Sequence, residues 1–236
     1  MPLKSEPVTL WVLVLPQMLM LDMVGPAEVF NFANRYAPES FELKFFGPSS
    51  PVVSGMGLSV NVAAMPERIP ANSWLLIPGL EGLNLDFSTP LMREVVDWLD
   101  CYQAFDKVIS VCSGALLLGH ADLLQSRACT THHSHLEELQ RVSPCASVQD
   151  NRLFVQDENL YTSAGVTAGI DLALYMVEQH CGVRCAAEIA RSLVLFSRRG
   201  GREPASSVWL TCRNHLDTKV HRVQDVIQAD PAKDWR

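Results

Sequence analysis

A cysteine stands where a buried strand meets a helix. Residues 107–111 form a short apolar, β-branched run, and residues 115–119 are rich in alanine and leucine. Only Cys112, Ser113 and Gly114 separate them, as in a strand that enters a helix through a minimal turn. A helix N-terminus offers unpaired amide donors and the positive end of the helix dipole, which favour a thiolate. The spacing therefore predicts Cys112 as a nucleophile on a strained turn at the carboxyl edge of a sheet.

A carboxylate follows the first apolar strand in the same way. Asp22 comes after the run at residues 8–15, in a loop that precedes a helix expected from Pro26 to residue 34. Pro26 and Glu28 suit the first turn of that helix. In open α/β sheets ligands bind at the carboxyl ends of the strands. Asp22 is therefore either a loop cap or a functional acid.

Two further places offer binding groups. Gly79 and Leu80 follow the strand at residues 74–77, where glycine lets backbone amides approach a ligand, although an ordinary turn explains them equally well. His132, in a polar run at residues 131–135, is a candidate base or ligand contact. A capping or surface histidine is the commoner outcome.

Composition bounds the class of protein. The chain has 236 residues, 48% hydrophobic and 19% charged, with a formal net charge of −7. These values fit a globular α/β domain. They argue against a nucleic-acid-binding surface on this chain, because such a surface needs a basic face. Seven cysteines without a C-x-x-C pair indicate reduced thiols in a cytoplasmic protein, with no metal site and no cofactor. We expect neither a signal peptide nor a membrane span.

Strands and helices alternate along the chain, which predicts an α/β fold: a mainly parallel, doubly wound sheet with helices on both faces. The expected strands lie at residues 8–15, 41–46, 74–77 and 107–111, with hairpins at 52–62 and 152–162. The expected helices lie at residues 26–34, 89–102, 134–141, 170–180 and 186–196.

The pattern changes near the C-terminus. Residues 197–204 are basic and glycine-rich, and residues 217–229 return to helical spacing with an apolar face. A single amphipathic helix after a linker has nothing of its own to bury against, so it either docks on this domain or on a partner subunit, or it opens a further domain. We therefore expect three parts: a domain at 8–197, a linker at 198–213 and a helical extension at 214–236.

Four ordered stretches resemble one family. Residues 21–30, 111–115, 129–132 and 164–174 are similar to the isonitrile-hydratase-like branch of the class I glutamine-amidotransferase-like superfamily, over residues 8–196. The resemblance implies a flavodoxin-like fold with a ligand-binding site at the cysteine elbow.

The same resemblance implies roles for single residues. Cys112 would be the nucleophile and Asp22 the acid, and the Ser113 amide would bind an anion together with the Gly79–Leu80 turn. Two positions depart from the family pattern. Leu80 stands where the enzymes carry a second glycine, and Ser113 stands where hydrolytic relatives often carry a histidine as general base. Turnover at Cys112 is therefore left open.

A second resemblance concerns the C-terminal part. Residues 193–201 are similar to the segment that ends this domain in AraC-type regulators, and residues 221–235 are similar to the first helix of their helix-turn-helix module. This implies a fragment of a longer transcription factor, with no DNA-binding residues in this fragment. The implied partners are a small-molecule effector, a second copy of the chain, and DNA through a module beyond residue 236; no membrane partner is expected.

Several functions follow from these observations. Our leading interpretation is a sensory domain that binds a small metabolite near Cys112, such as an amino acid or a quaternary amine, and thereby controls DNA binding. The alternative is a cysteine-dependent hydratase or amidase in which Cys112 attacks and Asp22 carries the proton. Redox sensing at Cys112 is a third hypothesis, and an inert relic of an enzyme is the fourth.

Overall fold

Six strands form the central sheet of the computed structural model, which describes residues 6–38, 40–82, 85–205 and 217–234. From edge to edge their order is β2-β1-β5-β6-β10-β9. Their bounds are β1 Val8–Leu13, β2 Phe41–Phe46, β5 Ser73–Ile77, β6 Lys107–Val111, β9 Phe154–Asp157 and β10 Leu160–Ser163.

The sheet is parallel except at one edge. β1 pairs with β2 and β5, β5 with β6, and β6 with β10, all parallel, whereas β9 runs antiparallel to β10. Every residue of β1 and β5 is buried, as expected for central strands covered on both faces. The chain leaves β1 toward β2 on one side and returns to β5 on the other. β1 and β5 therefore flank the point where ligands bind in doubly wound sheets.

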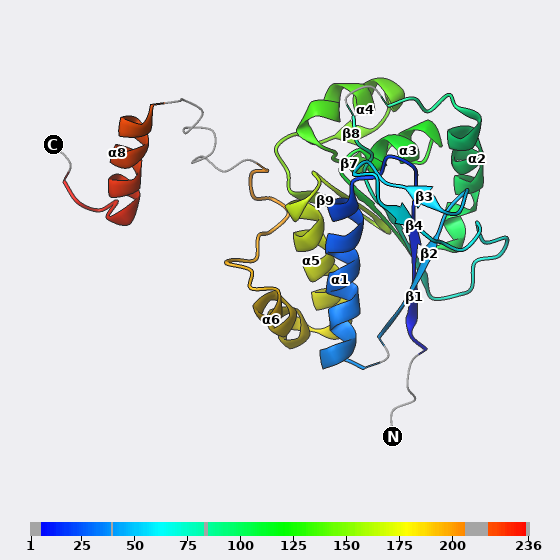
Figure 1. The fold of residues 1–236 in the computed structure, drawn as a ribbon, viewed down its shortest axis with the longest axis horizontal. Helices are drawn as coiled ribbons and strands as arrows, with labels where there is room; N and C mark the ends of the chain where they lie inside the picture. Colours follow the sequence, from blue (N-terminus) through cyan, green and yellow to red (C-terminus); the bar gives the residue numbers. More distant parts are fainter. Residues whose placement is uncertain (1–5, 39, 83–84, 206–216, 235–236) are drawn as a thin grey trace. The chain divides into compact units, whose positions relative to one another are not determined.

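Two groups of helices cover the sheet. In one group α1 contacts α5 and α6, and in the other α3 contacts α2 and α4 (Figure 1). The bounds are α1 Met20–Tyr36, α2 Pro90–Trp98, α3 Gly114–His120, α4 Leu136–Val142, α5 Thr167–Cys181 and α6 Val183–Ser192, with short 3-10 helices η1 Leu99–Ala104 and η2 His133–His135. The predicted α/β fold, with its mainly parallel sheet, is confirmed.

The start of the first helix was predicted wrongly. α1 begins at Met20, so Asp22 lies in its first turn rather than in a loop, and Pro26 lies inside the helix. A proline within a helix removes the hydrogen bond from its own nitrogen to the carbonyl four residues earlier, here that of Asp22. The helix tolerates this single loss because the apolar residues on both sides of Pro26 remain buried.

The end of α6 also differs from the prediction. The helix ends at Ser192 rather than continuing to residue 196. Val194 adopts a positive φ of 55°, and the Leu195 amide donates back to the Ala190 carbonyl at 3.0 Å. This backbone reversal, with its 6→1 hydrogen bond, is a common way for a helix to stop.

Smaller elements complete the domain. β3 Val52–Val53 and β4 Ser59–Val60 form the expected hairpin, and β7 Ala128–Cys129 pairs in parallel with β8 Ser147–Val148. The chain divides into two compact units between Glu203 and Pro204. The second half of the linker predicted at 198–213, residues 206–213, lies outside the described residues.

The second unit contains α8, Thr218–Ala229, the helix expected at 217–229. None of its residues is buried, and its valines are 43–58% exposed. Among the described helices, none combines the length and the apolar character needed to cross a membrane.

Candidate functional site

Four segments at the carboxyl edge of the sheet converge on one thiol. Cys112 follows β6, Asp22 lies in the helix after β1, Gly79 follows β5, and Val166 follows β10. These are the edges at which a doubly wound sheet binds its ligands. The structure therefore brings together Cys112, Asp22 and Gly79, which the sequence had named separately.

Cys112 sits on the strained turn that was predicted. Its φ is +57°, a left-handed value that is costly for a residue other than glycine. Hydrogen bonds on both sides hold it there: the Cys112 amide donates to the Ser163 carbonyl at 3.0 Å, and the Thr131 hydroxyl donates to the Cys112 carbonyl at 2.7 Å. The thiol is buried, with 4% of the residue exposed.

Asp22 is fully buried beside the thiol. Its Oδ1 accepts a hydrogen bond from the Val166 amide at 2.7 Å. Its Oδ2 faces Gly79 and the Cys112 side chain, but no hydrogen bond of good geometry reaches it. Burial raises the pKa of the Asp22 carboxyl, although the Val166 amide, the Cys112 thiol and the Gly79 amide act in the opposite direction.

The expectation of a stabilised thiolate at Cys112 was wrong. Burial, and next the charge of Asp22, raise the pKa of Cys112 to about 12. The Ser113 amide and hydroxyl lower this pKa without offsetting the increase. α3 has only seven residues, so its N-terminus is a weak source of positive potential compared with the desolvation of the sulfur. At neutral pH the resting state is the protonated thiol.

Two glycines form close walls around this pair. A methyl group on Gly79 would lie 2.5 Å from Asp22 Oδ2 and 2.8 Å from Cys112 Cβ. A methyl group on Gly165 would lie 2.8 Å from Cys112 Sγ, and Gly165 also has a φ of +108°. Glycine at both positions lets the backbone approach the reactive atoms.

The predicted anion-binding turn is already occupied by a hydroxyl. The Leu80 amide donates to Ser113 Oγ at 2.8 Å, and Ser113 Oγ donates to the Leu80 carbonyl at 3.1 Å. An incoming anion would have to displace the Ser113 side chain before it could reach the Leu80 amide. The Ser113 amide points at the Cys112 sulfur, where it favours negative charge.

His132 lies near the site through its neighbour Thr131 rather than through its own ring. Its Nδ1 lies 2.7 Å from the Ser134 hydroxyl, and it also accepts from the Ser134 amide as the N-cap of η2. Burial, with His133 and His135 nearby, lowers the pKa of His132. Within the described part of the chain, His132 makes no hydrogen bond to Cys112 or Asp22.

Sequence reasoning had given no site role to Thr131, Ser163, Gly165 or Val166. The first two fix Cys112 through its backbone, and Val166 supplies the amide that holds Asp22. Gly165 and Val166 do lie in the stretch at 164–174 that carries the family resemblance, but the resemblance gave neither of them a role. Within the described ranges, no three His, Cys, Asp or Glu side chains gather as a metal site would require.

Residues 8–179 match the DJ-1/PfpI family. The chain belongs to this family. It is 33% identical to isonitrile hydratase of Pseudomonas putida over 177 residues, which is 74% of this chain and 72% of that enzyme. A crystal structure of a ThiJ/PfpI family protein from Pseudomonas syringae superposes with a TM-score of 0.70 at 26% identity, covering 94% of this chain and 86% of that one.

Two transcriptional regulators of Pseudomonas aeruginosa are also similar to this member of the DJ-1/PfpI family. CdhR is 29% identical over 188 residues, and GbdR is 23% identical over 231 residues. These matches cover 78% and 96% of this chain but only 54% and 60% of the regulators. The regulators are thus considerably longer than the part that this chain matches.

Proposed function

We propose that this DJ-1/PfpI domain is the sensory domain of an AraC-type transcriptional regulator, which binds a small metabolite at the Cys112–Asp22 site. The observation that carries the proposal is the contact between Ser113 and Leu80. The Leu80 amide that would stabilise an oxyanion is taken by the Ser113 hydroxyl, and burial raises the pKa of the Cys112 thiol, which favours its protonated form. Such a site is better arranged to hold a ligand than to attack one.

The extent of the matches supports the same function. The similarity to GbdR covers 96% of the chain and so continues beyond residue 179, where the DJ-1/PfpI match ends. The exposed apolar valines of α8 fit a helix that packs within a larger assembly. In this proposal the DNA-binding module follows residue 236, and two copies of the chain act as a dimer.

The buried carboxyl suggests the chemistry of the effector. Asp22 Oδ2 is buried against Gly79 and Cys112 without a hydrogen bond of good geometry, so a donor or a cation that reached it would meet an unsatisfied acceptor. An amino acid or a quaternary amine would supply one of these. If the regulator has two conformations, the effector shifts it toward one of them only when it binds that conformation more tightly than the other.

The second candidate is a cysteine-dependent hydratase. It is supported by the identity with isonitrile hydratase, which exceeds the identity with either regulator. In that case the Cys112 sulfur adds to an electrophilic carbon, and Asp22 takes the thiol proton and returns it to the substrate. The buried contact between the two groups is the geometry that such a transfer needs.

One pair of proteins separates the two functions. Wild type and Cys112→Ala would be assayed on isonitriles and amides, and both would be screened by thermal unfolding against amino acids and quaternary amines. A sensor gives equal, background turnover and a ligand that raises the melting temperature of the wild type. Turnover by the wild type that Cys112→Ala abolishes would establish the hydratase instead.

A further inference from the structure

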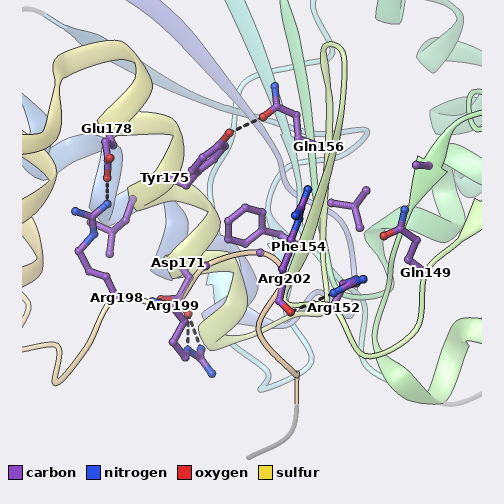
Figure 2. Close-up of a pocket in the computed structure, with 15 residues that line it drawn as sticks. Gln149, Arg152, Phe154, Gln156, Asp171, Tyr175, Glu178, Arg198, Arg199 and Arg202 are labelled. Carbon is purple, nitrogen blue, oxygen red and sulfur yellow. Dashed lines mark hydrogen bonds and ion pairs between the residues drawn. The ribbon is translucent and has the colours of Figure 1, made fainter.

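A cavity lies away from the cysteine and is lined in part by the segment that follows α6. It encloses about 790 Å³ between β9, α5 and residues 198–202 (Figure 2). This volume is within the range of small-molecule sites. We call residues 198–203 the connector. None of the site residues described above lines this cavity, so it is independent of the proposed function.

Two connector arginines are neutralised by α5. Arg199 donates from Nε to Asp171 Oδ2 at 2.9 Å and from its amide to Asp171 Oδ1 at 3.2 Å, and its Nη2 reaches the Thr167 hydroxyl at 2.9 Å. Arg198 pairs with Glu178, which lies two turns beyond Asp171 on the same face of the helix. These contacts fix the connector over α5 and leave neither cation available to a ligand.

The backbone of the connector is also tied to the sheet edge. The Leu153 amide donates to the Gly201 carbonyl at 3.2 Å, just before β9 begins. A methyl group on Gly201 would lie 2.7 Å from the Phe154 carbonyl, so glycine permits this approach. The position of residue 202 relative to β9 is therefore set by backbone contacts.

The other two arginines that line the cavity are Arg152 and Arg202. Arg152 Nη1 donates to the Arg202 carbonyl at 3.1 Å, as Figure 2 shows, and this is a contact with a neutral group. No carboxylate within the described residues forms an ion pair with Arg152 or Arg202. The one nearby acid of the connector, Glu203, accepts from the Gly200 amide. Two guanidinium groups without a carboxylate partner among the described residues thus border one cavity, in a chain whose net charge is −7.

Two aromatic rings contribute apolar surface to the cavity. The rings of Phe154 and Tyr175 lie 5.2 Å apart, with an interplanar angle of 37°, and both line the cavity together with the almost fully buried Leu174. The Tyr175 hydroxyl is committed to Gln156 at 2.7 Å, so the aromatic pair is held in place. A ligand would meet cations at one end and aromatic carbon along its length.

We propose that this cavity binds a small organic anion, whose carboxylate or phosphate group is held by Arg152 and Arg202 and whose flat apolar body rests against Phe154 and Tyr175. Guanidinium groups match both anions through paired, charge-assisted hydrogen bonds. Because Arg152 belongs to the body of the domain and Arg202 to the connector, the bound anion joins the two.

Titration calorimetry on the full chain tests this site. The probes are benzoate, phenyl phosphate and inorganic phosphate, with phenol as the uncharged analogue. We expect an aromatic anion to bind with a Kd of about 1 mM or below and phenol to bind far more weakly. Which of benzoate and phenyl phosphate binds more tightly identifies the preferred anionic group.

Matched variants give the proposal its sharpest test. Arg202→Gln removes a guanidinium but keeps the carbonyl that Arg152 contacts. This substitution should raise the Kd of the aromatic anions at least about tenfold. Arg152→Gln should do the same. Arg191→Gln, at an exposed arginine on α6, and Cys112→Ala should bind as the wild type does. The proposal is overturned if no anion binds, if phenol binds as tightly as benzoate, or if Arg202→Gln and Arg152→Gln leave the affinities unchanged.

Discussion

The side chain of Ser113 bonds twice to the backbone of Leu80, accepting from its amide at 2.8 Å and donating to its carbonyl at 3.1 Å. One hydroxyl therefore satisfies both polar groups of a residue that is 7% exposed. It also ties the loop after β5 to the turn after β6, the two segments that carry Gly79 and Cys112.

Removing that hydroxyl should destabilise the domain. Ser113→Ala leaves the buried Leu80 amide and carbonyl without their partner, and we expect a loss of about 1–3 kcal/mol in the free energy of unfolding. Urea denaturation would measure it. Ser88→Ala is the control, because the exposed Ser88 hydroxyl contacts only Asp86, and it should change stability by less than about 0.5 kcal/mol. Equal effects of the two substitutions would contradict the structural role of Ser113.

The close approach of Gly165 to the thiol can be separated from its backbone strain. Gly165 and Gly182 have φ values of +108° and +90°, but a methyl group at Gly182 would meet nothing within 4 Å. Gly182→Ala should therefore lower the free energy of unfolding by about 1–3 kcal/mol through backbone strain alone. Gly165→Ala should lower the free energy of unfolding by the same amount, and by about 1–3 kcal/mol more because the added methyl group would clash with Cys112. Thermal unfolding of both variants measures the difference; similar melting temperatures would argue against the contact.

The carboxyl of Asp22 should suppress the reactivity of Cys112. Only the thiolate is alkylated, and the charge of Asp22 contributes to raising the pKa of Cys112 to about 12. Asp22→Asn should lower this pKa, and alkylation by iodoacetamide at pH 8 should then rise about tenfold for each unit of the decrease. Mass spectrometry would follow the modification, with the exposed Cys145 as an internal reference. If the rate at Cys112 did not change, Asp22 would carry no charge that the thiol senses.

The same pKa makes stability depend on pH in a defined window. In the unfolded chain the thiol titrates near its ordinary value of 9.0, whereas in the folded protein it stays protonated to about pH 12. The folded state thus holds a proton that the unfolded state has lost, and stability is full below pH 9 and falls above it. Between pH 9 and about 10.5, the wild type should lose about 1.4 kcal/mol per pH unit more than Cys112→Ala. Parallel pH profiles of the two proteins would refute the buried, protonated thiol.

Removing the partner of Arg199 should loosen the connector. Asp171 is 6% exposed and accepts several hydrogen bonds from Arg199. Asp171→Asn should therefore reduce the free energy that holds the connector against α5 by about 1–3 kcal/mol. Limited digestion with trypsin should then cleave after Arg198 or Arg199 at least about tenfold faster. Glu188→Gln, which breaks an exposed pair with Arg191, should leave that rate unchanged. Cleavage at the wild-type rate in Asp171→Asn would show that this pair does not hold the connector.

Much of the architecture was predictable, because burial on both faces makes central strands continuous apolar runs. Residues 74–77 and 107–111 were recognised for that reason, and their positions fixed the edge where Gly79 and Cys112 would meet. The boundaries of α1 and α6 were less predictable. Pro26 is a good signal for a helix start, but the burial of the preceding turn decided otherwise.

The chemical state of the site could not be predicted from local sequence. Cys112 was expected to be a thiolate because a helix begins just after it, whereas its pKa is set by burial and by Asp22, which lies 90 positions earlier in the sequence. Val166 was missed for a related reason. It acts through its backbone amide, and the identity of a side chain carries no signal for such a role.

The hydrogen bond between Asp22 and Val166 also bears on how the protein folds. It joins residues 144 positions apart in the sequence, a large part of the length of the domain. Contacts of such separation form slowly, since the intervening chain must first be ordered. We infer that the pairing of β10 with β6 and the docking of α5 against α1 precede this contact. The Cys112–Asp22 site would then be among the last parts of the domain to form, and the ligand that we propose for it would recognise only chains that have finished folding.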